Sequence, residues 1–138
     1  TRLDKAFELF VRAGELGCNN VYNNVGCAYE TGSGAEIDKK KAGHYFKLAA
    51  VRGDVHARYN LGAAEENAGN MNRALKHYMI AAEGGHNIAL KKIQELYTNG
   101  HATKDDYAKA LRAYQAYLVE IKSTQRDKAA AARGKRYY

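Results

Sequence analysis

The residue types that carry most protein chemistry are sparse and scattered along this chain of 138 residues. A zinc site needs histidines and cysteines at short, fixed spacings, and a catalytic histidine needs a nearby nucleophile. The five histidines are His44, His56, His77, His86 and His101. None of them pairs with another histidine or with a cysteine at a metal-ligand spacing. We therefore expect no metal and no cofactor.

Two other patterns could suggest catalysis, and both have simpler explanations. The acidic pairs Glu65-Glu66 and Asp105-Asp106 consist of adjacent residues, which point to different sides of a helix. The sequence Gly32-Ser33-Gly34 lacks the Gly-Lys-Ser/Thr that completes a phosphate-binding loop. Cys27 would act as a nucleophile only if the fold brought a histidine beside it. We do not expect an enzyme.

The composition, with 46% apolar and 27% charged residues, is typical of a globular protein and not of a disordered tail or a membrane protein. No apolar run approaches the ~20 residues that span a bilayer, and no signal-peptide pattern opens the chain. Two cysteines do not make a disulfide scaffold. We expect Cys18 and Cys27 to be free thiols, with Cys27 buried. A soluble protein with no membrane span is expected, and the cytoplasm is the favoured compartment.

The net charge of +7 is unevenly distributed. Residues 1–121 carry 16 Lys+Arg against 14 Asp+Glu, whereas residues 122–138 carry six against one. Such a tail can hold nucleic acid or an acidic surface, or it can be a solvated end. The alanine run 129–132 predicts a helix there, which we expect to cover the last exposed face of the fold. The six cations are Lys122, Arg126, Lys128, Arg133, Lys135 and Arg136.

Four segments repeat one pattern, and this self-similarity is the strongest signal in the sequence. Each has a basic residue and alanine, then an aromatic residue four positions after the alanine; three of them reach a glycine eleven positions after it. This spacing predicts an amphipathic helix that ends at the glycine. The pairs are Lys5-Ala6, Lys41-Ala42, Arg73-Ala74 and Lys109-Ala110; the aromatics are Phe10, Phe46, Tyr78 and Tyr114; the glycines are Gly17, Gly53 and Gly85, with Ile121 in the fourth place.

A second kind of helix precedes each of the last three segments. We call these the A helices and the repeated segments the B helices. The A helices carry Val25-Gly26, Leu61-Gly62 and Ile93-Gln94 at matching positions. Gly26 and Gly62 leave room for a B helix to pack closely. Asp38, Asn70 and Asp106, each four residues before a B-helix alanine, are predicted to cap the B helices. Tyr22, Tyr29 and Tyr97 on the A helices are predicted to be core residues.

Stacked hairpins of this kind bury a continuous core, which a single hairpin cannot do. The sequence thus predicts a solenoid over residues 1–121, made of a half repeat plus three helix pairs, and a basic C-terminal helix or tail over residues 122–138.

The motifs resemble the Sel-1-like repeat, a tetratricopeptide-like family. The strings that carry the resemblance are Tyr59-Asn60-Leu61-Gly62, Tyr29-Glu30-Thr31-Gly32-Ser33-Gly34 and Lys41-Ala42 with Ala49-Ala50 and Gly53. The resemblance covers about residues 3–121. It implies an all-α fold, a right-handed α-solenoid of stacked antiparallel helix pairs. It also implies an adaptor or scaffold that binds another protein.

In solenoids of this type the A helices line the concave surface, and in tetratricopeptide domains they carry donors for the carboxylates of a peptide. Carried over residue by residue, this implies a donor-rich strip suited to an extended acidic or C-terminal peptide. Nucleic-acid binding through the tail is the alternative, which the nearly neutral body does not favour. The strip consists of Asn20, Asn24, His56, Asn60 and Lys92; we call it the A-helix strip.

Overall fold

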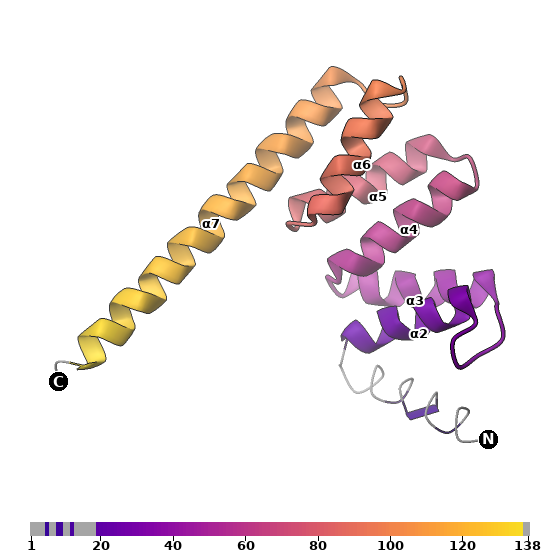
Figure 1. The fold of residues 1–138 in the computed structure, drawn as a ribbon, viewed down its shortest axis with the longest axis horizontal. Coiled ribbons are helices and arrows are strands. Elements are labelled where there is room, and N and C mark those ends of the chain that lie inside the picture. The colour runs from indigo at the N-terminus through magenta and orange to yellow at the C-terminus, as the bar shows by residue number, and fades with distance from the viewer. Residues whose placement is uncertain (1–4, 6–7, 10–11, 13–18, 137–138) are drawn as a thin grey trace.

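The computed structural model describes residues 19–136 together with Lys5, Glu8, Leu9 and Arg12, and this part of the chain contains helices and no strands. The all-α class is therefore confirmed. The first predicted B helix, with Phe10 and Gly17, lies mostly outside the described residues. The helices are α2 (Asn19–Thr31), α3 (Lys39–Val51), α4 (Val55–Asn67), α5 (Met71–Glu83), α6 (Asn87–Thr98) and α7 (Lys104–Arg136) (Figure 1).

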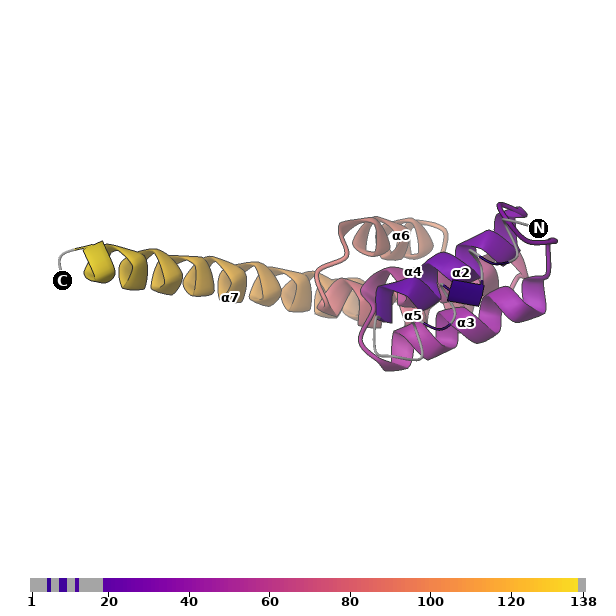
Figure 2. The same ribbon diagram turned by 90° about the horizontal axis from the view of Figure 1, so that it is seen from below.

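The helices stack as the repeat pattern predicts. The A helices are α2, α4 and α6, and the B helices are α3, α5 and the first half of α7. In Figure 2 α2, α4 and α6 lie on one side of the body, and α3 and α5 lie on the other. One buried cluster joins α2, α3 and the start of α4, and a second joins α5, α6 and α7. Each cluster thus joins residues from two neighbouring helix pairs.

Glycines on the A helices determine how closely each pair packs. A Cβ on Gly26 would lie 2.5 Å from the ring of Phe46, and a Cβ on Gly62 would lie 2.7 Å from the ring of Tyr78. Both rings are fully buried, with exposed fractions of 1% and 0%. The predicted close approach of A and B helices is therefore confirmed in the two pairs that keep the glycine.

The predicted helix caps are partly confirmed. Asp38 accepts a hydrogen bond from a backbone N–H in the first turn of α3. Asn70 lies at the N-cap of α5 but makes no cap bond there, because its amide donates to Glu65 at 2.9 Å. The prediction that Asp106 is the N-cap of α7 is wrong. The backbone N–H of Asp106 donates to the Thr103 hydroxyl, and the Asp106 carboxylate accepts from the Thr103 N–H, each at 3.0 Å. Thr103 is the cap, and Asp106 completes a capping box.

Helix α7 runs for 33 residues without a break between the predicted solenoid and the predicted tail. No glycine ends it at Ile121, and the alanine run 129–132 consists of the strongest helix former. The prediction that this run is helical is confirmed. Its predicted covering role is wrong, because all side chains from Leu118 to Gly134 are exposed and α7 points away from the body in Figure 1.

Three predictions about single side chains need correction. Tyr29, predicted to be a core residue, is half-buried and packs against the edge of the core cluster. Tyr97 is 40% exposed rather than buried. Ile93 and Leu96 occupy the buried side of α6, and Tyr97 lies at the edge of that side, with its ring centroid 5.7 Å from that of Tyr107. Cys27 is a free thiol, as predicted, but it is half-buried. Cys18 lies outside the described residues.

Candidate protein-binding surface

The first part of the A-helix strip connects α2 with α4. The side-chain amide of Asn60 on α4 donates to the amide oxygen of Asn23 on α2 at 2.9 Å, and it lies 3.8 Å from the sulfur of Cys27. Asn60 is half-buried by this contact, whereas Asn24, its counterpart in the previous repeat, is exposed. Asn60 therefore joins two A helices, and Asn24 presents a polar side chain to solvent beside that junction.

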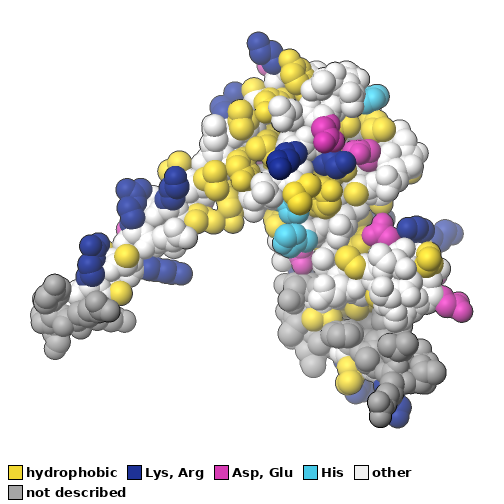
Figure 3. Space-filling view, viewed as in Figure 1, with side chains coloured by type: hydrophobic (Ala, Val, Ile, Leu, Met, Phe, Trp, Pro, Cys, Tyr) yellow, Lys and Arg dark blue, Asp and Glu magenta, His cyan; other side chains and the backbone are white. Residues whose placement is uncertain are grey.

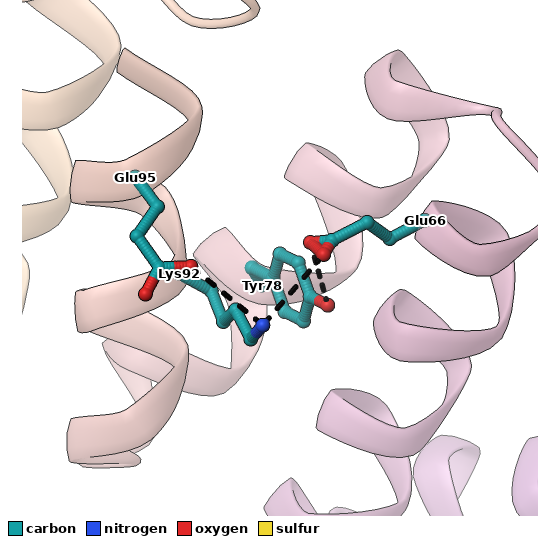
Figure 4. Close-up of polar contacts among 4 residues, drawn as sticks. All are labelled: Glu66, Tyr78, Lys92 and Glu95. Carbon is teal, nitrogen blue, oxygen red and sulfur yellow. Dashed lines mark hydrogen bonds and ion pairs between the residues drawn. The ribbon is translucent and has the colours of Figure 1, made fainter. Parts of the chain in front are cut away.

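The second part of the strip connects α4 with α6 (Figure 4). The Lys92 ammonium lies 3.7 Å from a carboxylate oxygen of Glu66 and 3.6 Å from one of Glu95. The Tyr78 hydroxyl donates to the other Glu66 oxygen at 3.4 Å. Glu66 therefore contacts both α5 and α6, and it links three helices.

The electrostatics follow from these contacts. Desolvation lowers the pKa of Lys92, but the attraction of Glu66 and Glu95 outweighs it, so this pKa lies above its ordinary value. Burial, followed by the negative charge of Glu66, raises the pKa of Tyr78. Lys92 stays charged, and two carboxylates already face it. The strip therefore offers less positive charge to a ligand than the sequence alone suggested.

Histidines form the junction between α4 and α6. His86 is 8% exposed, and its Nδ1 accepts the backbone N–H of Ala89 at 3.1 Å, which caps α6. Its ring stacks on Tyr59 with a centroid distance of 4.7 Å, and the His56 ring meets it edge-on at 5.1 Å. Since Nδ1 is the acceptor, His86 is neutral in this arrangement and carries its proton on Nε2.

Acidification is expected to destabilise the protein through His86. Burial and, second, the neighbouring His56 lower the pKa of His86 below its ordinary value of 6.5. The unfolded chain therefore binds this proton at a higher pH than the folded chain does. The stability that neutral His86 contributes is complete above pH 6.5. It is lost as the pH falls from 6.5 through the lowered pKa of folded-state His86. Burial and the positive charge of Arg58 also lower the pKa of His77. His77 therefore adds to the loss of stability on acidification.

Urea unfolding at pH 7.5 and below pH 6 measures this effect. His86→Asn is the informative variant, because asparagine retains a cap acceptor but does not titrate. We expect a smaller loss of unfolding free energy on acidification in His86→Asn than in the unchanged protein. Equal losses in the two proteins would show that His86 does not cause the pH dependence.

The structure assembles some residues of the predicted strip and leaves others apart. Asn60 reaches α2, Lys92 reaches α4, and His56 contacts the cap of α6, so these three lie at helix junctions. Asn24 is exposed without belonging to those contacts, and the side chain of Asn20 lies outside the described residues. Two hollows lined by described residues lie away from these contacts. One of about 380 Å³ lies between α5 and α7, and one of about 260 Å³ lies beside the loop that precedes α3.

The predicted tail residues lie on α7. Lys122, Arg126, Lys128 and Arg133 are exposed. Lys135 and Arg136 belong to the same helix, and their side chains lie outside the described residues. The basic tail is therefore helical up to Arg136.

Sequence reasoning missed the partners of the strip residues. Asn23 contacts Asn60, Glu66 contacts Lys92, and His86 contacts His56. Glu66 occurs at the same repeat position as Glu30, a recurrence that could have drawn attention to it. Nothing comparable marked Asn23, because its contact depends on how α2 and α4 are rotated relative to each other.

Within the described residues, no three His, Cys, Asp or Glu side chains are grouped so that they could hold a metal ion. Burial raises the pKa of the Cys27 thiol, and the charges of Glu30 and Asp54 raise it further. Cys27 is thus a poorer nucleophile than an ordinary cysteine. No helix in the described part of the chain is long and apolar enough to cross a membrane.

Comparisons with known proteins agree with the fold. A family model described as the Sel1 repeat matches residues 3–18, 21–54 and 55–86, together more than half of the chain. A putative sel1-like repeat-containing protein, L21 of Acanthamoeba polyphaga mimivirus, is 32% identical over 75 residues, which are 54% of this chain and 14% of that protein.

Two crystal structures have similar folds. A Sel1 repeat protein from Oxalobacter formigenes matches with a TM-score of 0.68 and 28% identity over 85% of this chain and 50% of its own. The protein c5321, a protective antigen present in uropathogenic Escherichia coli strains that displays an SLR fold, matches with a TM-score of 0.68 and 28% identity over 86% of this chain and 26% of its own. The chain thus spans half or less of each of these proteins.

Proposed function

The chain belongs to the Sel1 repeat family, whose members are commonly protein-interaction scaffolds, and from this premise we propose that it binds a partner protein through the surface of α2, α4 and α6. One observation carries the proposal. Residues of the A-helix strip join the three helices to one another, since Asn60 on α4 contacts Asn23 on α2 and Lys92 on α6 contacts Glu66 on α4. A partner segment that lies across the helices can therefore contact all three repeats at once.

The partner segment is an extended peptide recognised partly through its backbone. An asparagine amide offers both donors and an acceptor, which match the acceptor and donor of a peptide group. Asn24 is exposed and therefore accessible to such a peptide group. Asn60 lies on the neighbouring A helix. An asparagine that hydrogen-bonds to the peptide backbone does not depend on the peptide's side chains. Such binding suits a scaffold that accepts peptides of different sequence.

The charge balance of the strip bears on which peptides bind. Lys92 is paired with Glu66 and Glu95, so an acidic ligand would have to displace or outnumber these carboxylates. Such partly exposed ion pairs are each worth roughly 0.2–1 kcal/mol, which a ligand can overcome only with several contacts. We therefore propose a peptide of low net charge in place of a strongly acidic one.

A capture experiment with paired variants tests the proposal. The double variant Asn24→Ala/Lys92→Ala removes two strip side chains from different helices, and it is expected to weaken retention of the partner from source-cell lysate several-fold. The control Lys40→Ala/Lys76→Ala changes two exposed side chains on the B helices α3 and α5, and retention should not change. Circular dichroism checks that both variants stay folded. Equal retention by both would contradict binding at the A-helix strip.

A further inference from the structure

A second surface, separate from the A-helix strip, lies on the free part of α7. Tyr117 of α7 packs on the body, since a Cβ on Gly85 would meet its ring. Every described side chain from Leu118 to Gly134 is exposed. Figure 3 shows Lys and Arg side chains along this free length, which separates from the body. At 1.5 Å per residue, it extends for about 25 Å.

One face of this helix carries a row of cations. Lys122, Arg126 and Arg133 follow one another at steps of four and seven residues, which places them on one side of a helix. A shallow hollow lined by Lys122, Gln125, Arg126 and Ala129 agrees with this placement. The acidic residues Glu120 and Asp127 fall on the opposite side by the same periodicity. The charges of the row are therefore not neutralised by carboxylates of their own helix face.

Apolar side chains lie at the beginning of the same face. Leu118 is 40% exposed and Val119 is 62% exposed, and they precede Lys122 by four and three residues. Exposed large aliphatic side chains next to a charged row form a mixed surface, which gains from a partner that covers both parts. We call Leu118, Val119, Lys122, Arg126 and Arg133 the α7 stripe.

We propose that the α7 stripe docks an acidic, amphipathic segment of a partner protein. Its carboxylates pair with Lys122, Arg126 and Arg133, and its apolar side chains cover Leu118 and Val119. The α7 stripe covers 16 residue positions, a length of about 24 Å, which matches a partner helix of similar length. This partner is favoured because its negative charges complement the positive charges of the α7 stripe.

The same observations disfavour other occupants. Two copies of the α7 stripe facing each other would bring cations together, so the α7 stripe is not complementary to itself. Phosphates of a nucleic acid would pair with the cations but leave Leu118 and Val119 uncovered, and residues 1–121 add only two net positive charges to the attraction. A membrane surface would favour a helix with large apolar side chains along its full length, and here the large apolar side chains of this face, Leu118 and Val119, lie only at its beginning.

Fluorescence anisotropy tests the proposal with a labelled synthetic helix. The probe carries glutamates spaced to face the three cations and leucines at one end, and a matched probe has glutamine in place of each glutamate. We expect the glutamate probe to bind the full chain, and the glutamine probe to bind at least tenfold more weakly. The triple variant Lys122→Glu/Arg126→Glu/Arg133→Glu should weaken binding about tenfold or more, and Leu118→Ser/Val119→Ser several-fold.

The matched control is Lys40→Glu/Lys76→Glu/Lys91→Glu, which makes the same change of net charge on exposed positions of the body. It should bind the glutamate probe almost as well as the unchanged protein. Equal weakening by both triple variants would overturn the proposal, because binding of the glutamate probe would then depend only on net charge and not on the α7 stripe. Tighter binding of a short DNA duplex or of phosphatidylserine vesicles than of the glutamate probe would overturn it too, as would no binding of that probe.

Discussion

Tyr78→Ala is expected to lower the free energy of unfolding by about 3–5 kcal/mol, the range for truncating a large buried aromatic ring. The ring is 0% exposed and packs on Gly62 between α4 and α5, and its centroid lies 5.6 Å from that of Tyr59. The truncation leaves a cavity at the centre of the middle repeat and removes the hydroxyl that contacts Glu66. Chemical denaturation with urea measures the loss.

Two control variants separate packing from hydrogen bonding at this position. Tyr78→Phe keeps the ring and removes only the hydroxyl, so its cost should stay near 1 kcal/mol. Tyr97→Ala truncates the same residue type where it is 40% exposed, and it should cost much less than Tyr78→Ala. If Tyr78→Ala and Tyr97→Ala cost the same, the buried role assigned to Tyr78 is wrong.

Gly62→Ala is the second large effect, and its direction is opposite to what helix propensity predicts. Alanine in place of a helical glycine normally gains up to about 1 kcal/mol. At Gly62, however, the new Cβ would lie 2.7 Å from the ring of Tyr78, which is 0% exposed and packed on all sides by the core. We expect a net loss of about 1–3 kcal/mol, the usual cost of overpacking a core. Thermal and urea unfolding measure it.

Gly43→Ala provides the matched control for Gly62→Ala. Gly43 lies inside α3, and a Cβ there would meet nothing within 4 Å. This variant should be as stable as the unchanged protein or more stable. Stabilisation by both alanines would contradict the conclusion that the A-helix glycines control the distance between the helices of a pair.

Much of the fold could be predicted from sequence because the repeat fixes which residues are equivalent. Gly26 and Gly62 were expected to face a partner helix from their position alone, and each contacts the aromatic residue of its own B helix. Gly53 and Gly85 directly follow the C-caps of α3 and α5 with φ of +96° and +92°, a backbone conformation that favours glycine. These features are local or belong to one helix pair.

The errors arose where a residue has competing partners. Asn70 could cap α5, but Glu65 takes its amide. Asp106 was expected to begin a helix, and Thr103 begins it three residues earlier, because a threonine and an aspartate at this spacing satisfy each other's backbone groups. Sequence patterns identify such residues as polar and near a helix end, but not which contact is formed.

The candidate site was less predictable than the fold because it lies between repeats. Periodicity places Asn60 and Lys92 on corresponding faces of α4 and α6, yet it does not fix the rotation of one A helix against the next. That rotation decides that Asn60 meets Asn23 and that Lys92 meets Glu66. The links between the A helices and the lowered positive charge of the strip both follow from these contacts and appear only in three dimensions.

Site-specific photo-crosslinking tests most directly whether the A helices bind the partner. A photoreactive amino acid is placed in turn at Asn24, His56 and Glu95 on the A helices, and at Lys40, Lys47 and Lys76 on the B helices; all six side chains are exposed. Crosslinks to one partner from the A-helix positions, and none from the B-helix positions, are the predicted result. Crosslinks to the partner from the B-helix positions alone would contradict the proposed binding surface.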